Sequence, residues 1–360
     1  MEKIMKKHKV ISTALICVVV LVVSLFVISH AVYHRSFVAT VIEIYMNVID
    51  REAMYAAYAE QVPEQPVALA RAIEPQALEI ENEAEPVAAF AAEEPMVAEP
   101  YLKPKSVKMD IPYYDSYEHG MQVYHFNEEV SSDTLIVYYP GGGYLNQPLK
   151  YHWRIINKLS QEVNCPVLMP VYPKTPEYTC EESYEIVMKF YLDCVATKDV
   201  KKLVFMGDSS GGGMALVMAQ LLRDNYPEVL QPDEIILLSP WLDISMDNEE
   251  IREVDPHDPM LDCDGVAAVG RMWAGNRDVH DPMASPIYGT FENLGRITMF
   301  ASTRDILCPD AVKLSEMLNE QGIEHTFICE EGLNHPYALF PIPEAADARE
   351  VMVKAIKGEY

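Results

Sequence analysis

The 360-residue sequence has few basic residues and shows no internal repeat of 20–50 residues. Its 28 Lys and Arg residues stand against 55 Asp and Glu residues, for a formal net charge of -27 at pH 7. A chain of this charge has no basic face to neutralise phosphates, which excludes nucleic acid as a partner. The lack of a repeat argues against a solenoid or a propeller.

The seven cysteines have no C-x-x-C spacing, so the sequence does not predict a zinc site. We expect most of them to be buried small apolar residues, although export would permit a disulfide. Cys17 lies in an apolar run near the N-terminus, and the other six are scattered: Cys165, Cys180, Cys194, Cys263, Cys308 and Cys329.

That apolar run, residues 10–29, contains no charged residue and follows a basic segment at residues 1–9 with four lysines. Its 20 residues can cross a bilayer as a helix, and basic residues before it favour a cytoplasmic N-terminus and an exported remainder. Ser29-His30-Ala31 also fits a signal-peptidase site, so secretion after cleavage near Ala31 is the alternative. The length of the run favours an uncleaved signal-anchor that holds the protein on the membrane.

Two segments separate this run from the rest of the chain. Apolar residues in segment 30–60 recur at helical spacing, which predicts a juxtamembrane helix that packs on the domain, lies at the membrane surface or forms part of a lid. Segment 61–105 repeats Glu-Pro and Ala-Glu with almost no aromatic residues. This composition predicts an extended, disordered acidic linker.

Residues 106–360 alternate short apolar runs with helical stretches, which is typical of βαβ units and a mostly parallel sheet. The predicted fold class is therefore α/β. Strands are expected at 107–113, 121–125, 134–139, 167–171, 202–206, 234–238, 297–301 and 325–329, and helices at 152–163, 182–195, 212–225, 264–273, 310–321 and 344–357.

The strand expected at 202–206 runs into Gly207-Asp208-Ser209-Ser210-Gly211, a G-x-S-x-G turn. Such a turn holds a serine on a sharp strand-to-helix bend, with its hydroxyl exposed at the carboxyl edge of the sheet. Ser209 is therefore the predicted nucleophile. The motif alone also fits a glycine-rich turn of any α/β protein, so the prediction depends on the partner residues.

Oxyanion donors are predicted at a second glycine run. The strand expected at 134–139 ends in Pro140-Gly141-Gly142-Gly143, whose consecutive glycines let backbone N–H groups point into a cleft. Acyl transfer needs such donors for the oxygen that becomes negative in the tetrahedral intermediate. We assign this role to the N–H groups of Gly141, Gly142 and Ser210.

The acid and the histidine of a serine triad should follow the serine in that order. Asp305 comes just after the strand expected at 297–301, and His335 follows the strand expected at 325–329. His335 would take the proton of Ser209, and Asp305 would hold the tautomer of His335 and stabilise its imidazolium.

Other acids and histidines are weaker candidates. Asp310 is the rival acid, but it opens a helix after a proline and is better explained as an N-terminal cap. His152 starts a helix, while His257 and His280 lie in loops rich in Asp and Pro.

With these residues in place, the chain resembles the α/β-hydrolases, and among them the hormone-sensitive-lipase-like esterase branch, over about residues 107–357. The sequence PGGG at 140–143 stands where that branch has HGGG, and GDSSGG at 207–212 corresponds to its GDSAGG. YPKTPE at 172–177 is similar to its Y-x-x-x-P-E segment, and SPWLD at 239–243 follows the next strand as in relatives.

The resemblance implies an α/β-hydrolase fold, with a mostly parallel eight-stranded sheet, helices on both faces and a small cap at about residues 246–288. It implies a serine carboxylesterase for small-molecule esters of short acyl chains, acetyl among them, without a metal or an organic cofactor. Asp208 and Glu177 would support the site. A peptidase or amidase of the same fold, or a non-catalytic binding module, is the alternative function.

Two features depart from the family pattern. Pro140 replaces the first histidine of the glycine loop, which keeps the backbone donors but puts the orientation of the loop in question. The acidic linker separates the N-terminal helix from the domain, so the usual N-terminal lid is expected to be absent or rearranged.

Overall fold

The computed structural model describes residues 36, 38–42 and 100–360. The predicted signal-anchor at 10–29 and most of segments 30–60 and 61–105 lie outside these residues. Within the described part of the chain, no helix is both long and apolar enough to cross a membrane. The signal-anchor therefore stays a prediction.

One eight-stranded sheet forms the centre of the described chain, in the order β1-β2-β4-β3-β5-β6-β7-β8. β2 pairs antiparallel with both β1 and β4, and the remaining neighbours are parallel, which confirms the predicted mostly parallel sheet. The strands are β1 (Tyr113–Glu118), β2 (Met121–Phe126), β3 (Thr134–Tyr139), β4 (Val167–Pro170), β5 (Lys202–Asp208), β6 (Glu234–Leu238), β7 (Arg296–Ser302) and β8 (His325–Glu330).

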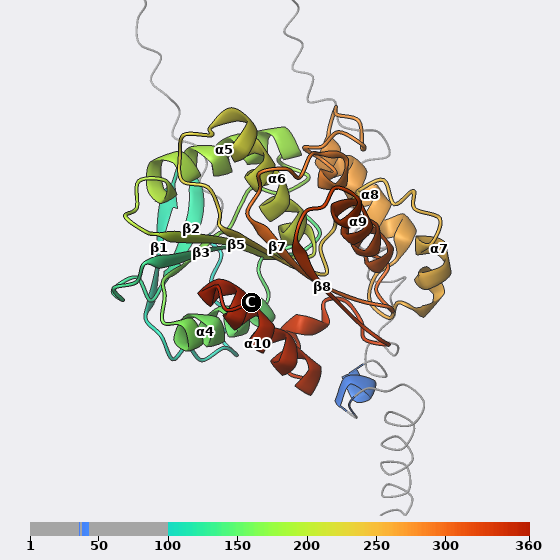
Figure 1. Ribbon diagram of the computed structural model, residues 1–360, viewed down its shortest axis with the longest axis horizontal. Helices are drawn as coiled ribbons and strands as arrows, with labels where there is room; N and C mark the ends of the chain where they lie inside the picture. Colours follow the sequence, from blue (N-terminus) through green and yellow to red (C-terminus); the bar gives the residue numbers. More distant parts are fainter. Residues whose placement is uncertain (1–35, 37, 43–99) are drawn as a thin grey trace, which may run out of the picture.

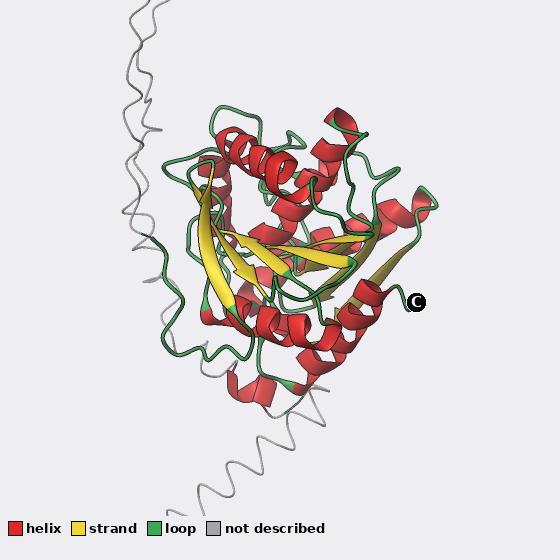
Figure 2. Cartoon of the chain, turned by 90° about the vertical axis from the view of Figure 1, so that its left-hand side faces the viewer, coloured by secondary structure: helices red, strands yellow, loops and turns green. Residues whose placement is uncertain are grey.

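Helices cover both faces of this sheet (Figures 1 and 2). α4 and α10 pack on one face, and α5, α6, α8 and α9 pack on the other. The helices are α4 (Lys150–Val163), α5 (Cys180–Phe190) followed by a π-helical turn (Tyr191–Val195), α6 (Ser210–Asn225), α7 (Ile251–Val254), α8 (Cys263–Ala274), α9 (Cys308–Glu320) and α10 (Pro343–Lys357).

The central strands are buried on both faces, as β3 illustrates. Leu135, Val137 and Tyr139 point into the core under α5 and α6, whereas Ile136 and Tyr138 point into the core over α4 and α10. Successive side chains of a strand alternate between its two faces. A strand covered by helices on both sides is therefore apolar throughout, which is why its sequence predicts it so clearly.

The first predicted strand, at 107–113, is wrong. Most of this stretch is a loop that buries Val107 and Ile111, and β1 starts only at Tyr113. β1 is an edge strand whose tyrosines, including Tyr114 and Tyr117, are exposed. Strand prediction depends on apolar residues that recur within a strand. Here the buried apolar residues lie in the loop, and the strand that follows is exposed.

The folded domain begins before the predicted boundary at 106. Trp153 of α4 donates its indole N–H to the Tyr101 hydroxyl at 2.8 Å, and the Tyr101 N–H donates to Gln122 Oε1 at 3.0 Å. Tyr101, near the end of the predicted linker, therefore belongs to the folded domain.

Part of the juxtamembrane segment is described and is helical, at residues 38–42. Ser36 donates its hydroxyl to Glu344 Oε2 at 2.9 Å, at the start of α10, and Ala39 is buried among the residues of the α10 face. Of the three arrangements expected for this segment, packing on the domain is the one seen for these residues.

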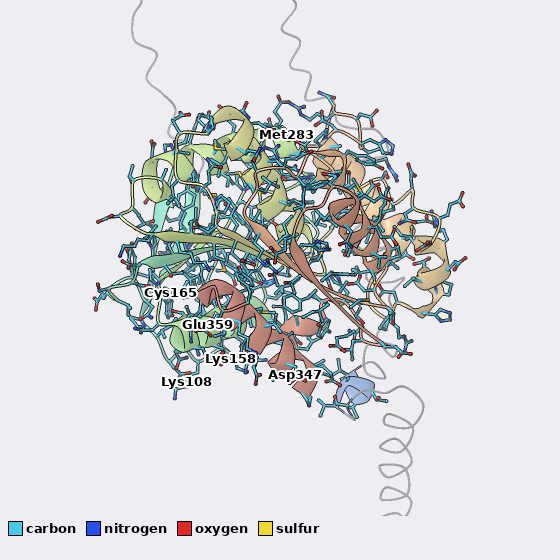
Figure 3. The ribbon with its side chains drawn as sticks, viewed as in Figure 1. Lys108, Lys158, Cys165, Met283, Asp347 and Glu359 are labelled. Carbon is cyan, nitrogen blue, oxygen red and sulfur yellow. The ribbon has the colours of Figure 1, made fainter. Side chains whose placement is uncertain are left out.

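The segment at 246–288, predicted as a cap, carries α7 and α8. Its apolar side chains join the core that includes α6. Figure 3 shows Met283 of this segment on the opposite side of the molecule from Lys158 of α4.

The turn between β5 and α6 allows no side chain at two of its glycines. A Cβ atom at Gly207 would lie 2.1 Å from the Gly211 carbonyl oxygen, and one at Gly211 would lie 2.0 Å from the Tyr139 carbonyl oxygen. Both distances are far inside van der Waals contact. Only glycine lets the first turn of α6 approach the ends of β5 and β3, and this approach positions the residue between them, Ser209.

Candidate active site

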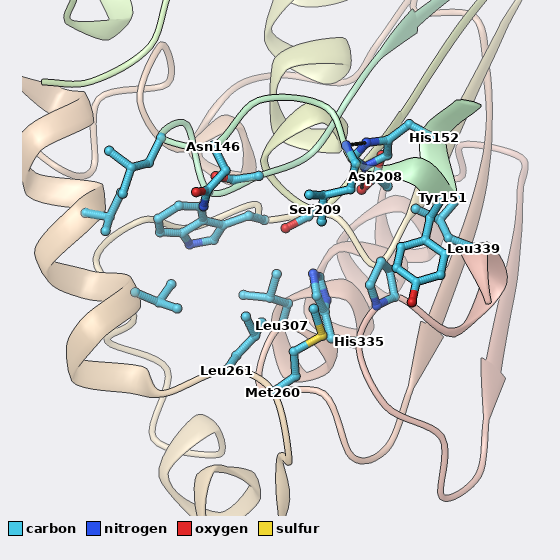
Figure 4. Close-up of a pocket in the computed structure, with 18 of the residues that line it drawn as sticks. Asn146, Tyr151, His152, Asp208, Ser209, Met260, Leu261, Leu307, His335 and Leu339 are labelled. Atoms are coloured by element: carbon cyan, nitrogen blue, oxygen red, sulfur yellow. Dashed lines mark hydrogen bonds and ion pairs between the residues drawn. The ribbon is translucent and has the colours of Figure 1, made fainter. Parts of the chain in front are cut away.

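Ser209 is the single residue between the end of β5 and the start of α6, and it has a backbone conformation that L-residues rarely adopt. Its φ is 53° and its ψ is -126°. Hydrogen bonds hold this conformation: the Ser209 N–H donates to the Leu238 carbonyl at 2.9 Å, and the Ser209 carbonyl accepts from Trp241 N–H at 2.9 Å. Strain of this kind persists only where the surroundings enforce it. The Ser209 side chain lines a cavity at the carboxyl edge of the sheet (Figure 4).

His335 and Asp305 form a buried hydrogen-bonded pair. His335 Nδ1 lies 2.8 Å from Asp305 Oδ2, and the side chains are 3% and 0% exposed. The Nδ1 atom faces the carboxylate, so it carries the proton and leaves Nε2 as the acceptor. His335 lines the same cavity as Ser209 (Figure 4). The structure thus brings together the three residues predicted for the triad, from loops after β5, β7 and β8.

Negative charge around His335 raises its pKa. Burial by itself would lower the pKa, but the charge and hydrogen bond of Asp305 outweigh it, with smaller contributions from Asp258 and Asp208. The net pKa lies above the ordinary histidine value. A raised pKa means that the protonated imidazolium is stabilised inside the protein.

Asp258 is a second buried acid that the sequence analysis missed. Its Oδ2 accepts the Ile306 N–H at 2.9 Å, and its Oδ1 accepts the N–H groups of Met260 and Leu261 at 2.8 and 2.9 Å. Burial and the nearby charge of Asp305 raise the Asp258 pKa to about 6. The sequence shows only an acid in a loop, because its importance comes from contacts across the fold.

Asp310, the rival acid, does not contact His335. It lies in the first turn of α9, where it accepts a hydrogen bond from Asn248 Nδ2 at 2.9 Å, and burial raises its pKa to about 6. The predicted role of Asp310 as the cap is wrong, since the N-cap residue of α9 is Leu307.

Gly141 was expected to supply an oxyanion N–H, and the structure corrects this. The Gly141 N–H donates to Asp208 Oδ1 at 3.0 Å, so it is not free to bind a developing oxyanion. Gly142 and Gly143 line the cavity beside Ser209. Among the described residues, the N–H groups of Gly142, Gly143 and Ser210 have no hydrogen-bond acceptor. Gly143 therefore replaces Gly141 in the candidate oxyanion hole.

Asp208 joins the glycine loop to the serine turn. Its carboxylate accepts the Tyr138 hydroxyl at 2.6 Å as well as the Gly141 N–H, and His152 Nε2 lies 3.2 Å away. His152 Nδ1 accepts the Leu149 N–H at 2.8 Å, so Nε2 is the nitrogen that donates to Asp208. Burial would raise the Asp208 pKa, but these partners lower it.

The structure changes the predicted importance of two residues, His152 and Glu177. Asp208, predicted to support the site, lines the cavity, and His152, which the sequence ranked low, is one of its partners (Figure 4). The other predicted supporting residue, Glu177, is exposed on a turn and does not line the cavity. Its place beside a proline in a family-like motif concealed that the turn faces solvent.

The cavity has a volume of about 270 Å³ and a mainly apolar lining. Met260, Leu261, Val266 and Val269 come from the predicted cap segment, and Trp241 lies beside the serine turn. No cluster of three possible metal ligands occurs among the described residues.

Several known proteins are similar to this chain in sequence. A family model described as alpha/beta hydrolase fold matches residues 136–339. A triacylglycerol lipase of Mycobacterium tuberculosis is 26% identical over 63% of this chain, but the match spans only 47% of that lipase. An esterase of Acinetobacter venetianus is 24% identical over 64% of this chain and 76% of its own length.

Solved structures share the fold. A Staphylococcus aureus protein classed as an esterase has a TM-score of 0.68 at 29% identity, over 71% of this chain and 87% of its own. An esterase from the bacterial hormone-sensitive lipase family has a TM-score of 0.65 at 22% identity, over the same shares of the two chains.

Two adjacent tyrosines of β3 test the contribution of the Asp208 network. Tyr138→Phe removes a hydrogen bond to a buried carboxylate, so we expect the free energy of unfolding to fall by about 1.5–3 kcal/mol. Urea denaturation measures this. The control is Tyr139→Phe, an equally buried hydroxyl with no hydrogen-bond partner among the described residues, which should leave stability unchanged or raised. Equal losses in the two variants would contradict the proposed importance of Asp208.

Proposed function

This chain belongs to the alpha/beta hydrolase fold family, and we propose that it is a serine carboxylesterase of the hormone-sensitive-lipase-like branch that acts on small esters of short acyl chains. One observation carries the proposal: His335, which is hydrogen-bonded to the buried Asp305, lines the same small apolar cavity as Ser209. A strained serine, a histidine oriented by an acid and unpaired N–H groups are the parts that acyl transfer requires.

In the proposed mechanism, His335 Nε2 takes the proton of Ser209 as Oγ attacks the ester carbonyl carbon. The carbonyl oxygen becomes negative and is bound by the N–H groups of Gly142, Gly143 and Ser210. His335 then protonates the leaving alkoxide, and the acyl group remains on Ser209.

Hydrolysis of the acyl-enzyme repeats these steps with water. His335 takes a proton from water, whose oxygen attacks the acyl carbon, and then returns a proton to Ser209 Oγ as the carboxylic acid leaves. Asp305 holds Nδ1–H throughout and stabilises the imidazolium.

The size of the cavity supports the preference for short acyl chains. Ligand pockets commonly measure about 300–1,000 Å³, and this cavity, at about 270 Å³, is small for one. Apolar side chains from the cap segment and Trp241 line the cavity, which favours an acyl chain over a charged group.

Hydrolysis of p-nitrophenyl esters from acetate to laurate by the purified full-length protein tests the proposed preference for short acyl chains. We expect kcat/KM to be highest at acetate to butyrate. Ser209→Ala removes the nucleophile and should lower kcat by at least about 10⁴-fold, whereas the neighbouring Ser210→Ala keeps the N–H that the mechanism uses and should remain active. Undiminished turnover by Ser209→Ala, a preference for laurate, or turnover of aminoacyl anilides in place of esters would contradict the proposal.

The dependence of kcat/KM on pH tests the proposed role of His335 as the base. His335 works as a base only when neutral, and its pKa is raised, so kcat/KM should fall as the pH drops through a value above 6.5, the ordinary histidine pKa. Asp258→Asn removes one of the charges that raise this pKa, so the acid limb should move to lower pH. Asp310→Asn, a buried acid away from His335, should leave the limb in place. An acid limb that Asp258→Asn leaves unmoved would contradict the assignment of His335 as the base.

We propose further that residues 10–29 anchor the enzyme in a membrane with its catalytic domain on the extracellular side. The uncharged apolar run behind four lysines supports this arrangement. Val20→Arg with Leu21→Arg costs about 2.5–3.5 kcal/mol per substitution at the centre of a spanning helix, so the variant should leave the carbonate-washed membrane fraction. Recovery of the unchanged protein in the soluble fraction, with an N-terminus at Val32, would show cleavage instead.

A further inference from the structure

Two thiols lie in contact directly behind the candidate active site. Cys308 Sγ and Cys329 Sγ are 3.5 Å apart. Cys308 is the first residue of α9, three positions after Asp305, and Cys329 lies in β8, six positions before His335. The pair therefore connects the two chain segments that carry the acid and the histidine.

The backbone around the pair is well held. The Cys308 N–H donates to the Asp305 carbonyl at 2.9 Å, and Cys329 pairs with Ala301 across the parallel β7–β8 ladder. A disulfide requires a sulfur–sulfur distance of about 2.05 Å. The two sulfur atoms, which are 3.5 Å apart, must therefore approach each other by about 1.5 Å to form the bond.

Exposure differs between the two thiols. Cys329 is exposed, whereas Cys308 is 5% exposed. A reagent from solvent thus meets Cys329 first, and Cys308 lies behind it as the second thiol.

We propose that Cys308 and Cys329 are a redox-active dithiol, which a low-molecular-weight disulfide such as oxidised glutathione converts to an intramolecular disulfide. The Cys329 thiolate attacks one glutathione sulfur and releases one glutathione thiolate. Cys308 then gives its proton to solvent, and its sulfur attacks Cys329 in the mixed disulfide and releases the second glutathione. Two protein thiols are oxidised by two electrons, and one glutathione disulfide is reduced to two thiols.

The acidities of the two groups support this order of steps. The hydrogen bond between the thiols lowers the pKa of Cys329 and, together with burial, raises the pKa of Cys308. The thiolate is the attacking species in thiol–disulfide exchange. Cys329 is therefore both the accessible sulfur and the more readily ionised one.

The disulfide would join the start of α9 to β8 and close the chain between residues 308 and 329. Closing such a loop restricts the unfolded chain, so the oxidised protein should be more resistant to heat. This inference does not depend on esterase activity, and its readouts, a covalent link and a melting temperature, are independent of turnover.

The test equilibrates the purified full-length protein with reduced or oxidised glutathione, blocks free thiols with N-ethylmaleimide and digests it with trypsin without reduction. Cleavage after Arg304, Lys313 and Arg349 places the two cysteines on peptides 305–313 and 314–349. We expect a disulfide-linked pair of these peptides after oxidation only, and a rise of roughly 5–10 °C in melting temperature.

Matched variants separate this pair from other thiols. Cys329→Ser and Cys308→Ser should each abolish the linked peptides and the thermal shift, and the exposed position of Cys329 makes its serine variant the safer one for folding. Cys194→Ser, at a partly exposed thiol elsewhere, should retain both effects. Stable glutathionylation of Cys329 without the linked peptides, no oxidation of either thiol, or a thermal shift that persists in Cys329→Ser would overturn the proposal.

Discussion

The geometry of the site depends on the hydrogen bonds that the buried carboxylate of Asp208 accepts. Asp208 is 2% exposed, and it accepts hydrogen bonds from Tyr138 on β3, Gly141 in the glycine loop and His152 on α4. A hydrogen bond to a charged group commonly contributes about 1.5–3 kcal/mol, so these three segments are held in place around it. Because Asp208 immediately precedes Ser209, the same network positions Ser209 and the glycine loop beside it.

The network also explains how the glycine loop is held in place although Pro140 stands where the family has a histidine. The Pro140 carbonyl accepts the Tyr172 hydroxyl at 2.7 Å, and the next N–H group, of Gly141, is bound by Asp208. These two bonds fix the start of the loop. The N–H groups of Gly142 and Gly143 are left to face the cavity, one position later than the sequence analysis assigned them.

On the other side of the cavity, two acids share the surroundings of His335. Asp305 contacts the imidazole, and Asp258 reaches the backbone of Ile306, the residue after Asp305, while it holds Met260 and Leu261 at the cavity wall. The acid loop and the cap segment are therefore joined through one side chain.

The sequence by itself determined the α/β class and the positions of the central strands, because these strands are apolar throughout. It also predicted Ser209, Asp305 and His335 as a triad, because each of them follows a strand that its pattern revealed; in the structure His335 hydrogen-bonds Asp305 and lines one cavity with Ser209. It could not place the edge strand β1, whose exposed tyrosines lack the apolar pattern, nor exclude Glu177. Only the tertiary structure decided which N–H groups are free, that His152 and Asp258 belong to the site, and that Cys308 meets Cys329. These features depend on contacts between residues far apart in the chain, and hydrogen-bond partners and burial at such distances leave no periodic signal in the sequence.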